Sequence, residues 1–246
     1  MRYLVVSDIH SNWEALQAVL RAAQGQYELI VSCGDLVGYG PDPNRVVDWA
    51  RESLHATIRG NHDRACCGMD DLEWFNPVAQ AATRWTIGKL TPENALYLRN
   101  LPRGPALEGP AILVHGSPLD EDEYVSSIAD ASNIFPYLES GLTFFGHTHL
   151  QGGFAWLRGT QGFVDRPTER VARLQLFLDP AGCWLVNPGS VGQPRDGDPR
   201  AAYALFDSGT NQLVLGRATY DTEAVCAKIV QAGLPPALGS RLALGR

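Results

Sequence analysis

The sequence contains no apolar run long enough to cross a bilayer, so no membrane-spanning helix is predicted. It also has no cluster of Lys and Arg, and its formal net charge of -7 argues against stable nucleic-acid binding, which relies on basic side chains at the phosphates. The five cysteines are scattered and include no C-x-x-C pair, so no disulfide framework is indicated. The chain enters its first strand at Arg2, which leaves no room for a signal peptide. We therefore expect a cytoplasmic protein that binds neither nucleic acid nor a membrane.

The composition is typical of a folded domain with a large core. Of the 246 residues, 45% are hydrophobic and 19% are charged, and no repeat, linker or low-complexity tract divides the chain. We predict one domain over residues 1–246. The sequence does not distinguish a monomer from a homodimer.

Short apolar runs alternate with helical periodicities along the first half of the chain. Strands are predicted at residues 2–6, 28–33, 55–59, 111–114 and 142–145. Helices are predicted over 13–23, within 66–100 (two helices) and over 127–139. Further starting signals are an Asn at the cap position before residue 13, and an Asp-Pro and a Thr-Pro pair at 42–43 and 91–92.

The second half of the chain has a different pattern, because strands follow one another there without intervening helices. They are predicted at residues 153–156, 170–178, 184–186, 203–206 and 212–215. We expect the first half to form a parallel-leaning sheet and the second half an antiparallel-leaning one. Two stacked mixed β-sheets flanked by helices, a four-layer αββα sandwich of the α/β class, combine the two halves. An amphipathic helix near 222–232 and a polar tail end the predicted fold.

Five apolar runs each stop at or next to a residue that can bind a metal ion. These residues are Asp8, Asp35, Asn61, His115 and His147. Each run is typical of a buried strand, so the five side chains are expected to lie along one edge of a sheet. A single Asp, Asn or His at a strand end is more often a turn residue or a helix cap. The ordered set of five instead indicates a two-metal hydrolytic site.

The motifs around these positions are Asp8-Ile9-His10, Gly34-Asp35, Gly60-Asn61-His62-Asp63, His115-Gly116 and Gly146-His147-Thr148-His149. In this order they resemble the calcineurin-like metallophosphoesterase superfamily, in particular its small bacterial and archaeal phosphodiesterase branch. The resemblance covers most of the chain and extends to the later segments Asn187-Pro188-Gly189-Ser190 and Gln193-Pro194-Arg195. It implies the same αββα sandwich.

The resemblance also implies a centre with two divalent transition-metal ions. Asp35 is expected to bridge the ions, and the remaining ligands are Asp8, His10 and His149 at the first site and Asn61, His115 and His147 at the second. Mixed imidazole and carboxylate ligands favour Mn, with Fe, Zn or Ni as alternatives, over Ca. Two such ions generate a hydroxide near neutral pH, so the expected reaction is in-line attack by a bridging hydroxide on phosphorus.

His62 follows the expected ligand Asn61 and is predicted not to bind metal. A protonated imidazole at this position could stabilise a phosphoryl oxygen or protonate the leaving alkoxide, and Asp63 could orient it. Arg195 is a candidate substrate-binding residue, with a solvated loop arginine as the alternative. We expect the neighbouring aromatic residues to pack in the core rather than to line a nucleobase pocket; these are Trp13, Tyr39, Trp74, Phe75 and Trp85.

One departure from relatives narrows the predicted substrate. Eukaryotic-type Ser/Thr protein phosphatases follow their Gly-Asp with an Asp-Arg-Gly that grips phosphate, whereas here Gly34-Asp35 is followed by Leu36-Val37-Gly38. The first prediction is therefore a metallophosphoesterase that hydrolyses small phosphodiesters or nucleotides, and the second is a dinucleoside polyphosphate hydrolase. A catalytically silent metal-binding scaffold is the third alternative, which the presence of all seven expected ligands disfavours.

Overall fold

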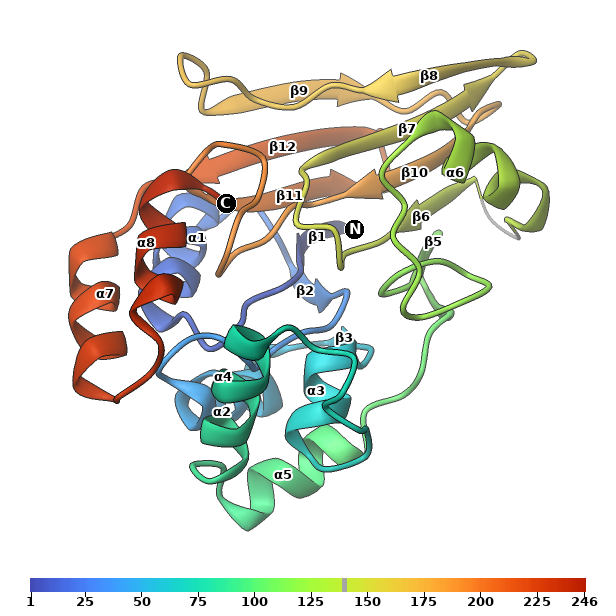
Figure 1. Cartoon of the computed structure of the whole chain (residues 1–246). Coiled ribbons are helices and arrows are strands. Elements are labelled where there is room, and N and C mark those ends of the chain that lie inside the picture. Colours follow the sequence, from blue (N-terminus) through green and yellow to red (C-terminus); the bar gives the residue numbers. More distant parts are fainter. Residues whose placement is uncertain (139–140) are drawn as a thin grey trace.

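Two β-sheets stacked face to face form the centre of the computed structural model, which describes residues 1–138 and 141–246 (Figure 1). The first sheet contains β1 (Arg2–Val6), β2 (Leu29–Ser32), β3 (Ala56–Thr57), β9 (Arg173–Phe177), β11 (Ala201–Asp207) and β12 (Gln212–Ala218). The second sheet contains β4 (Ala106–Glu108), β5 (Ala111–Leu113), β6 (Leu142–Phe144), β7 (Gly152–Leu157), β8 (Thr160–Val164) and β10 (Cys183–Asn187). The predicted pair of mixed sheets is confirmed.

The prediction that the first half of the chain forms one sheet and the second half the other is wrong. The strand orders are β3-β2-β1-β11-β12-β9 and β4-β5-β6-β10-β7-β8, so each sheet combines strands from both halves of the chain and contains parallel and antiparallel pairs. In the first sheet, β1 is parallel to β2 and antiparallel to β11. In the second, β6 is parallel to both β5 and β10. Parallel strands of both sheets have their carboxyl ends on the same side of the sandwich, and the candidate site lies there.

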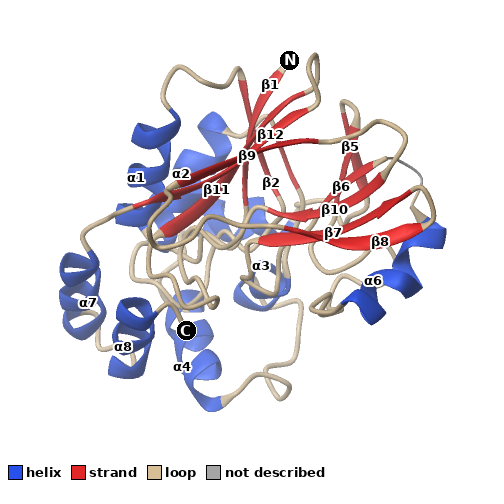
Figure 2. Cartoon of the chain, turned by 90° about the horizontal axis from the view of Figure 1, so that it is seen from above, coloured by secondary structure: helices blue, strands red, loops and turns tan. Residues whose placement is uncertain are grey.

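Helices cover both outer faces of the stacked sheets, as Figure 2 shows. The described helices are α1 (Trp13–Ala23), α2 (Pro43–Ser53), α3 (Asn61–Cys66), α4 (Pro77–Ile87), α5 (Pro92–Arg99), α6 (Ile128–Ile134), α7 (Thr222–Gln231) and α8 (Pro236–Leu244), with a 3-10 turn at Phe135–Tyr137. None of the helices in the described ranges is long and apolar enough to cross a membrane.

Three groups of buried apolar residues occupy the three interfaces of this sandwich. Leu4 and Val6 of β1 pack with the helices on one side, whereas Tyr3 and Val5 of the same strand belong to the core between the sheets. The ring of Phe144 in β6 contacts that of Phe206 in β11 across this core, with centroids 6.0 Å apart. A third group lies between the second sheet and α6. The predicted four-layer αββα arrangement is therefore confirmed.

The helix-starting signals are only partly confirmed. The side chain of Asn12 accepts a hydrogen bond from Ala15 N at 3.1 Å and caps α1 as predicted. Thr91 caps α5 in the same way, through a 3.2 Å bond from Asn94 N. Asp42 does precede α2, but its carboxylate makes no capping bond and instead accepts a 2.7 Å hydrogen bond from Lys228 in α7.

Several elements lie outside the predicted set. Helix α3 starts at Asn61, and β4 and β8 are short strands at one edge each of the second sheet. The expected polar tail is wrong, because residues 236–244 form α8 and bury Leu238 and Leu242. The helix predicted over 127–139 is shorter and ends at Ile134, and residue 139 lies outside the described residues.

Candidate metal centre

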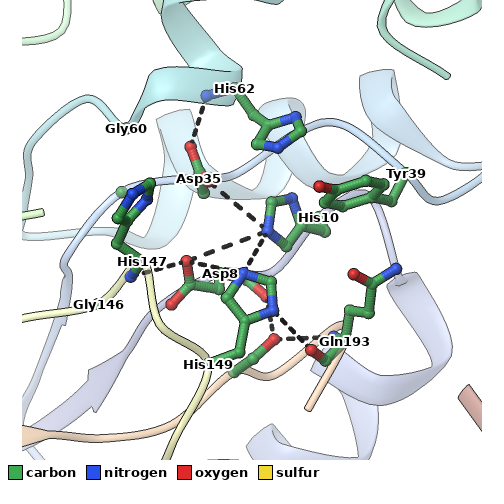
Figure 3. A network of polar contacts seen from close by, with 12 residues as sticks. Asp8, His10, Asp35, Tyr39, Gly60, His62, Gly146, His147, His149 and Gln193 are labelled. Atoms are coloured by element: carbon green, nitrogen blue, oxygen red, sulfur yellow. Dashed lines mark hydrogen bonds and ion pairs between the residues drawn. The ribbon is translucent and has the colours of Figure 1, made fainter. Parts of the chain in front are cut away.

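The loops after five parallel strands converge on one buried cluster of polar side chains (Figure 3). The loops after β1, β2 and β3 come from the first sheet, and those after β5 and β6 come from the second. They bring together all seven predicted ligands, which are Asp8, His10, Asp35, Asn61, His115, His147 and His149. The strand-end pattern in the sequence therefore corresponds to one place in the fold.

Asp8, His10 and His149 form the first group that could hold a metal ion. His149 Nε2 lies 3.4 Å from Asp8 Oδ1 and 3.1 Å from His10 Nε2. All three side chains are almost fully buried. Three ligand atoms of this kind, converging on one point, suit a transition-metal ion.

The second group lies on the other side of Asp35 and is centred on His115. His115 Nε2 is 3.1 Å from Asn61 Oδ1, 3.2 Å from His147 Nδ1 and 3.4 Å from Asp35 Oδ2. Asp35 Oδ2 is also 3.6 Å from His10 Nε2 in the first group. One carboxylate oxygen therefore faces histidines of both groups, which is the geometry a bridging ligand requires.

The tautomers of three histidines are set by backbone carbonyls. The Nδ1 atoms of His10, His115 and His149 lie 2.9, 2.8 and 2.6 Å from carbonyl oxygens of the neighbouring loops. A carbonyl oxygen only accepts, so each Nδ1 carries a proton and, in the neutral imidazole, Nε2 keeps its lone pair. Because the Nε2 lone pairs of His10 and His149 then face each other, a cation between them would remove an unfavourable contact. The three histidines are thus prepared as ligands by the backbone.

Burial and the neighbouring charges shift the pKa values of several side chains in the centre. Burial, together with the negative charge of Asp35, raises the pKa of Asp8 to about 7. Burial lowers the pKa of His10 to about 4. Burial opposes a charge on His115 too, but the adjacent Asp35 carboxylate raises the pKa of that imidazole to about 10. Among the described residues, Asp8 Oδ2 and His147 Nε2 have no hydrogen-bond partner, so the donor set fits divalent cations.

Five of the predicted ligands have a backbone conformation that side-chain-bearing residues rarely adopt. Of the nine non-glycine residues with positive φ in the described ranges, these five are Asp8, His10, Asp35, His147 and His149. Their φ angles lie between 47° and 65°. Such residues cost conformational energy and persist only where the surroundings hold them, which is a common property of functional sites.

Asp63 has a different role from the one expected. Its carboxylate accepts hydrogen bonds from the backbone N atoms of Asp35, Val37 and Gly60, at 2.8, 3.1 and 3.0 Å. No bond from the imidazole of His62 to Asp63 occurs within the described residues. Asp63 thus ties the loops after β2 and β3 together and positions Asp35 rather than orienting His62.

His62 is held by its own backbone and by ring contacts. Its backbone N donates to Asp35 Oδ1 at 2.9 Å. The centroid of its ring lies 4.4 Å from the ring centroid of Tyr39 and 4.9 Å from that of Phe75. Burial lowers the pKa of His62 to about 3, so the imidazole is neutral at pH 7. This differs from the protonated imidazole considered in the sequence analysis. Without substrate, His62 is therefore a neutral hydrogen-bonding group at the edge of the centre.

Arg195 lies beside the first ligand group. Its backbone N donates to His149 O at 3.2 Å, and its guanidinium donates to Tyr39 Oη and Gln193 Oε1, both at 3.3 Å. The Nε atom is buried and has no partner within residues 1–138 and 141–246. Tyr39 and Gln193, which the sequence analysis did not assign to the site, hold this side chain and His149 in place.

A cavity of about 610 Å³ adjoins the centre. Asn61, His62 and His147 contribute to its wall, together with Tyr39, Trp74 and Tyr124. Trp74 is 93% exposed, so the expectation that it packs in the core is wrong. The cavity is large enough for a small organic ligand.

Comparison with known proteins gives the family. The profile of the calcineurin-like phosphoesterase superfamily domain matches residues 1–211. The chain belongs to this superfamily. An uncharacterized protein of Methanocaldococcus jannaschii is 34% identical over 247 residues, a match that covers 98% of this chain and 97% of the relative. The fold and motif resemblance predicted from the sequence are thereby confirmed.

Solved structures agree with this assignment. The crystal structure of a metallophosphoesterase from Sphaerobacter thermophilus has a TM-score of 0.86 and 38% identity, and the match covers 100% of this chain and 99% of that one. A putative diadenosine tetraphosphatase has a TM-score of 0.50 and 18% identity, with 87% and 93% of the two chains covered. At this identity the second match indicates a shared fold alone.

We expect Gly60→Ala to disrupt the centre. A Cβ at this position would collide with the carboxylate and the backbone N of Asp35, so Asp35 would have to move. Such overpacking typically costs about 1–3 kcal/mol, and the variant should retain less metal after dialysis. Gly162→Ala is the matched control, because a Cβ there meets nothing within 4 Å. Equal metal content in both variants, measured by elemental analysis, would contradict this account.

Proposed function

We propose that the protein is a metal-dependent phosphodiesterase with two divalent cations at the centre. Asp8, His10 and His149 would hold the first cation, Asn61, His115 and His147 would hold the second, and Asp35 would serve both. The observation that supports this most strongly is the position of Asp35 Oδ2, 3.6 Å from His10 Nε2 and 3.4 Å from His115 Nε2. Mn is the proposed metal, because the donors are imidazole, carboxylate and amide groups.

When bound, two such cations would supply positive charge beside the phosphoryl oxygens and would lower the pKa of water toward neutrality. The residues around them bind and orient the substrate. Arg195 is proposed to donate to a phosphate oxygen, since its guanidinium lies beside His149 and its Nε has no partner in the described part of the chain. His62 donates a hydrogen bond to a phosphoryl oxygen or to the leaving oxygen. The imidazole can do so in its neutral form, and a bound substrate anion would raise the pKa of His62. Asp63 acts as a positioning residue.

A dinucleoside polyphosphate hydrolase is the second candidate. Its support is the similar fold of the putative diadenosine tetraphosphatase, which at 18% identity says nothing of the residues that bind substrate. A catalytically silent scaffold ranks below both, because all seven proposed ligands and His62 are present and gathered in one place. The cytoplasm, where nucleotides and divalent cations are both abundant, is the proposed location.

A comparison of two chromogenic substrates tests the proposed function. The Mn-supplemented protein should hydrolyse bis(4-nitrophenyl) phosphate faster than 4-nitrophenyl phosphate, and His62→Ala should lose the diester activity. Faster hydrolysis of the monoester would replace the diesterase proposal with a phosphatase. A metal-loaded protein without His62-dependent activity on either substrate would favour polyphosphate substrates or a scaffold.

Metal removal is expected to lower the thermal stability. A ligand present at 100 times its dissociation constant stabilises the native state by about 2.7 kcal/mol, which corresponds to roughly 5–10 °C in Tm for a chain of this size. Scanning calorimetry in a chelator and after Mn addition measures this difference. In Asp8→Asn the metal-dependent part of the shift should be much smaller. An unchanged Tm in the wild type would argue that the centre binds no cation.

A further inference from the structure

The cavity beside the centre has two chemically different parts. Its inner wall includes His62, which is proposed to contact the phosphate, and the proposed metal ligands Asn61 and His147. Its outer wall includes Trp74, Phe75 and Tyr124, along with several charged residues. A phosphate group bound at the centre would therefore carry its ester substituent toward the aromatic wall.

The outer wall presents aromatic surface that is largely exposed at Trp74 and about half exposed at Tyr124. Trp74 is 93% exposed and Tyr124 is 55% exposed, although both line the cavity. Phe75 packs edge-on against His62, and the ring of Tyr124 lies 4.0 Å from that of His147. An exposed tryptophan beside a catalytic site is poorly explained by folding, because it buries almost nothing. Covering it with a planar ligand would recover this area.

The charges of the outer wall oppose a second phosphate. Arg64 is its basic residue, but the guanidinium is already paired with Asp70, Glu121 and Asp122, the last at 2.8 Å. Asp71 adds a further carboxylate to the wall. The outer part is thus negatively charged, which disfavours the anionic chain of a polyphosphate and favours an uncharged group with hydrogen-bond donors.

We propose that this cavity is a nucleobase subsite, an inference that rests on the proposed phosphodiesterase function and names its substrate class. The base of a nucleotide stacks on the aromatic wall, and its exocyclic amino group donates to the carboxylates of the rim. The volume of about 610 Å³ suits a nucleoside and greatly exceeds the needs of phosphate alone. Trp74 is then a specificity-determining residue for the group attached to phosphorus.

Two substrates with the same leaving group isolate the subsite. Adenosine 5′-(4-nitrophenyl) phosphate carries a base, whereas methyl 4-nitrophenyl phosphate does not. Trp74→Ala should lower kcat/KM for the adenosine ester about 10-fold, mainly through KM, and leave the methyl ester unchanged. Trp74→Phe should restore most of the difference. Tyr137→Ala is the matched control, because Tyr137 is 59% exposed and does not line the cavity.

The outcomes separate the subsite from the proposed function. Equal losses on both esters, or no loss on either, would overturn the subsite while the hydrolytic function stands. If the wild type hydrolysed neither ester, the proposed function would fail, and titration calorimetry would judge the subsite alone. Adenosine 5′-monophosphate should then bind at least 10-fold more tightly than inorganic phosphate, and Trp74→Ala should remove the difference. Binding of O-phosphotyrosine as tight as that of the nucleotide would overturn the assignment to a nucleobase.

Discussion

Replacing Asp35 by Asn is expected to remove one metal ion and nearly all activity. Asp35 Oδ2 lies within 4 Å of His10 Nε2 in the first ligand group and of His115 Nε2 in the second. The ion pairs of Asp8 in the described residues involve histidines of the first group alone. An amide oxygen keeps the shape but carries no charge to offset two cations. Charge stabilisation by the metals contributes several kcal/mol to the transition state, so we expect a loss of about 10³-fold or more in kcat/KM.

The control and the fold check make this prediction specific. Asp35 Oδ1 accepts the backbone hydrogen bond from His62, which an amide oxygen can also accept, so the loops should keep their shape. Circular dichroism and a thermal melt in chelator verify that the variant folds. Asp165→Asn removes an exposed carboxylate elsewhere and should change neither metal content nor rate. Two tightly bound ions and normal turnover in Asp35→Asn would refute the bridging role.

The position of the centre was predictable because strand ends are local features of the sequence. Strands such as β1 and β5 are short and apolar, and each stops two residues before a candidate ligand, Asp8 or His115. The carboxyl ends of parallel strands meet at the same edge, so a polar residue there is placed without knowing the strand order. For this reason the sequence predicts that all seven residues lie together, although the predicted assignment of strands to sheets is wrong.

Strand order depends on pairings that sequence periodicity does not encode. β1 pairs with β11, about 200 residues later in the chain, and β6 pairs with β10. Strands of both sheets contribute apolar residues to the core between the sheets, so apolar character alone does not assign a strand to a sheet. The last helix, α8, was missed for a related reason, because it starts at a Pro-Pro pair, contains Gly239, and is stabilised by packing against α7.

The supporting residues of the centre were the least predictable part. Asp63 was expected beside His62 because the two are adjacent in the sequence, but it bonds to the backbone of the loop after β2 instead. The positive φ angles at Asp8 and Asp35 occur where the backbone N of each residue bonds to a distant loop, which the sequence does not show. The sequence does contain one indication of these contacts, the glycines that precede Asp35 and Asn61. The loops of Gly34 and Gly60 lie so close together that a side chain at either position would collide with the other loop. These contacts hold the strained ligands.

Replacing His62 by Ala should slow turnover by roughly 10²–10⁴-fold while both metal ions remain bound. The imidazole lines the cavity and contacts the rings of His10 and Tyr39, yet it belongs to neither group of proposed ligands. Its loss removes a hydrogen bond to the reacting phosphate and leaves the cations in place. The decrease should therefore appear in kcat, with metal content by elemental analysis unchanged.

His55→Ala provides the matched control, because His55 is half exposed and pairs with Glu108 at 3.2 Å on the surface. It should keep wild-type turnover, which shows that removal of an imidazole alone is harmless. His62→Gln keeps a hydrogen-bond donor and should recover part of the rate, since a neutral donor is what the buried environment of His62 favours. If His62→Ala hydrolyses bis(4-nitrophenyl) phosphate at the wild-type rate with two metal ions bound, His62 is a packing residue, and the phosphate must be stabilised by the metals and Arg195 without it.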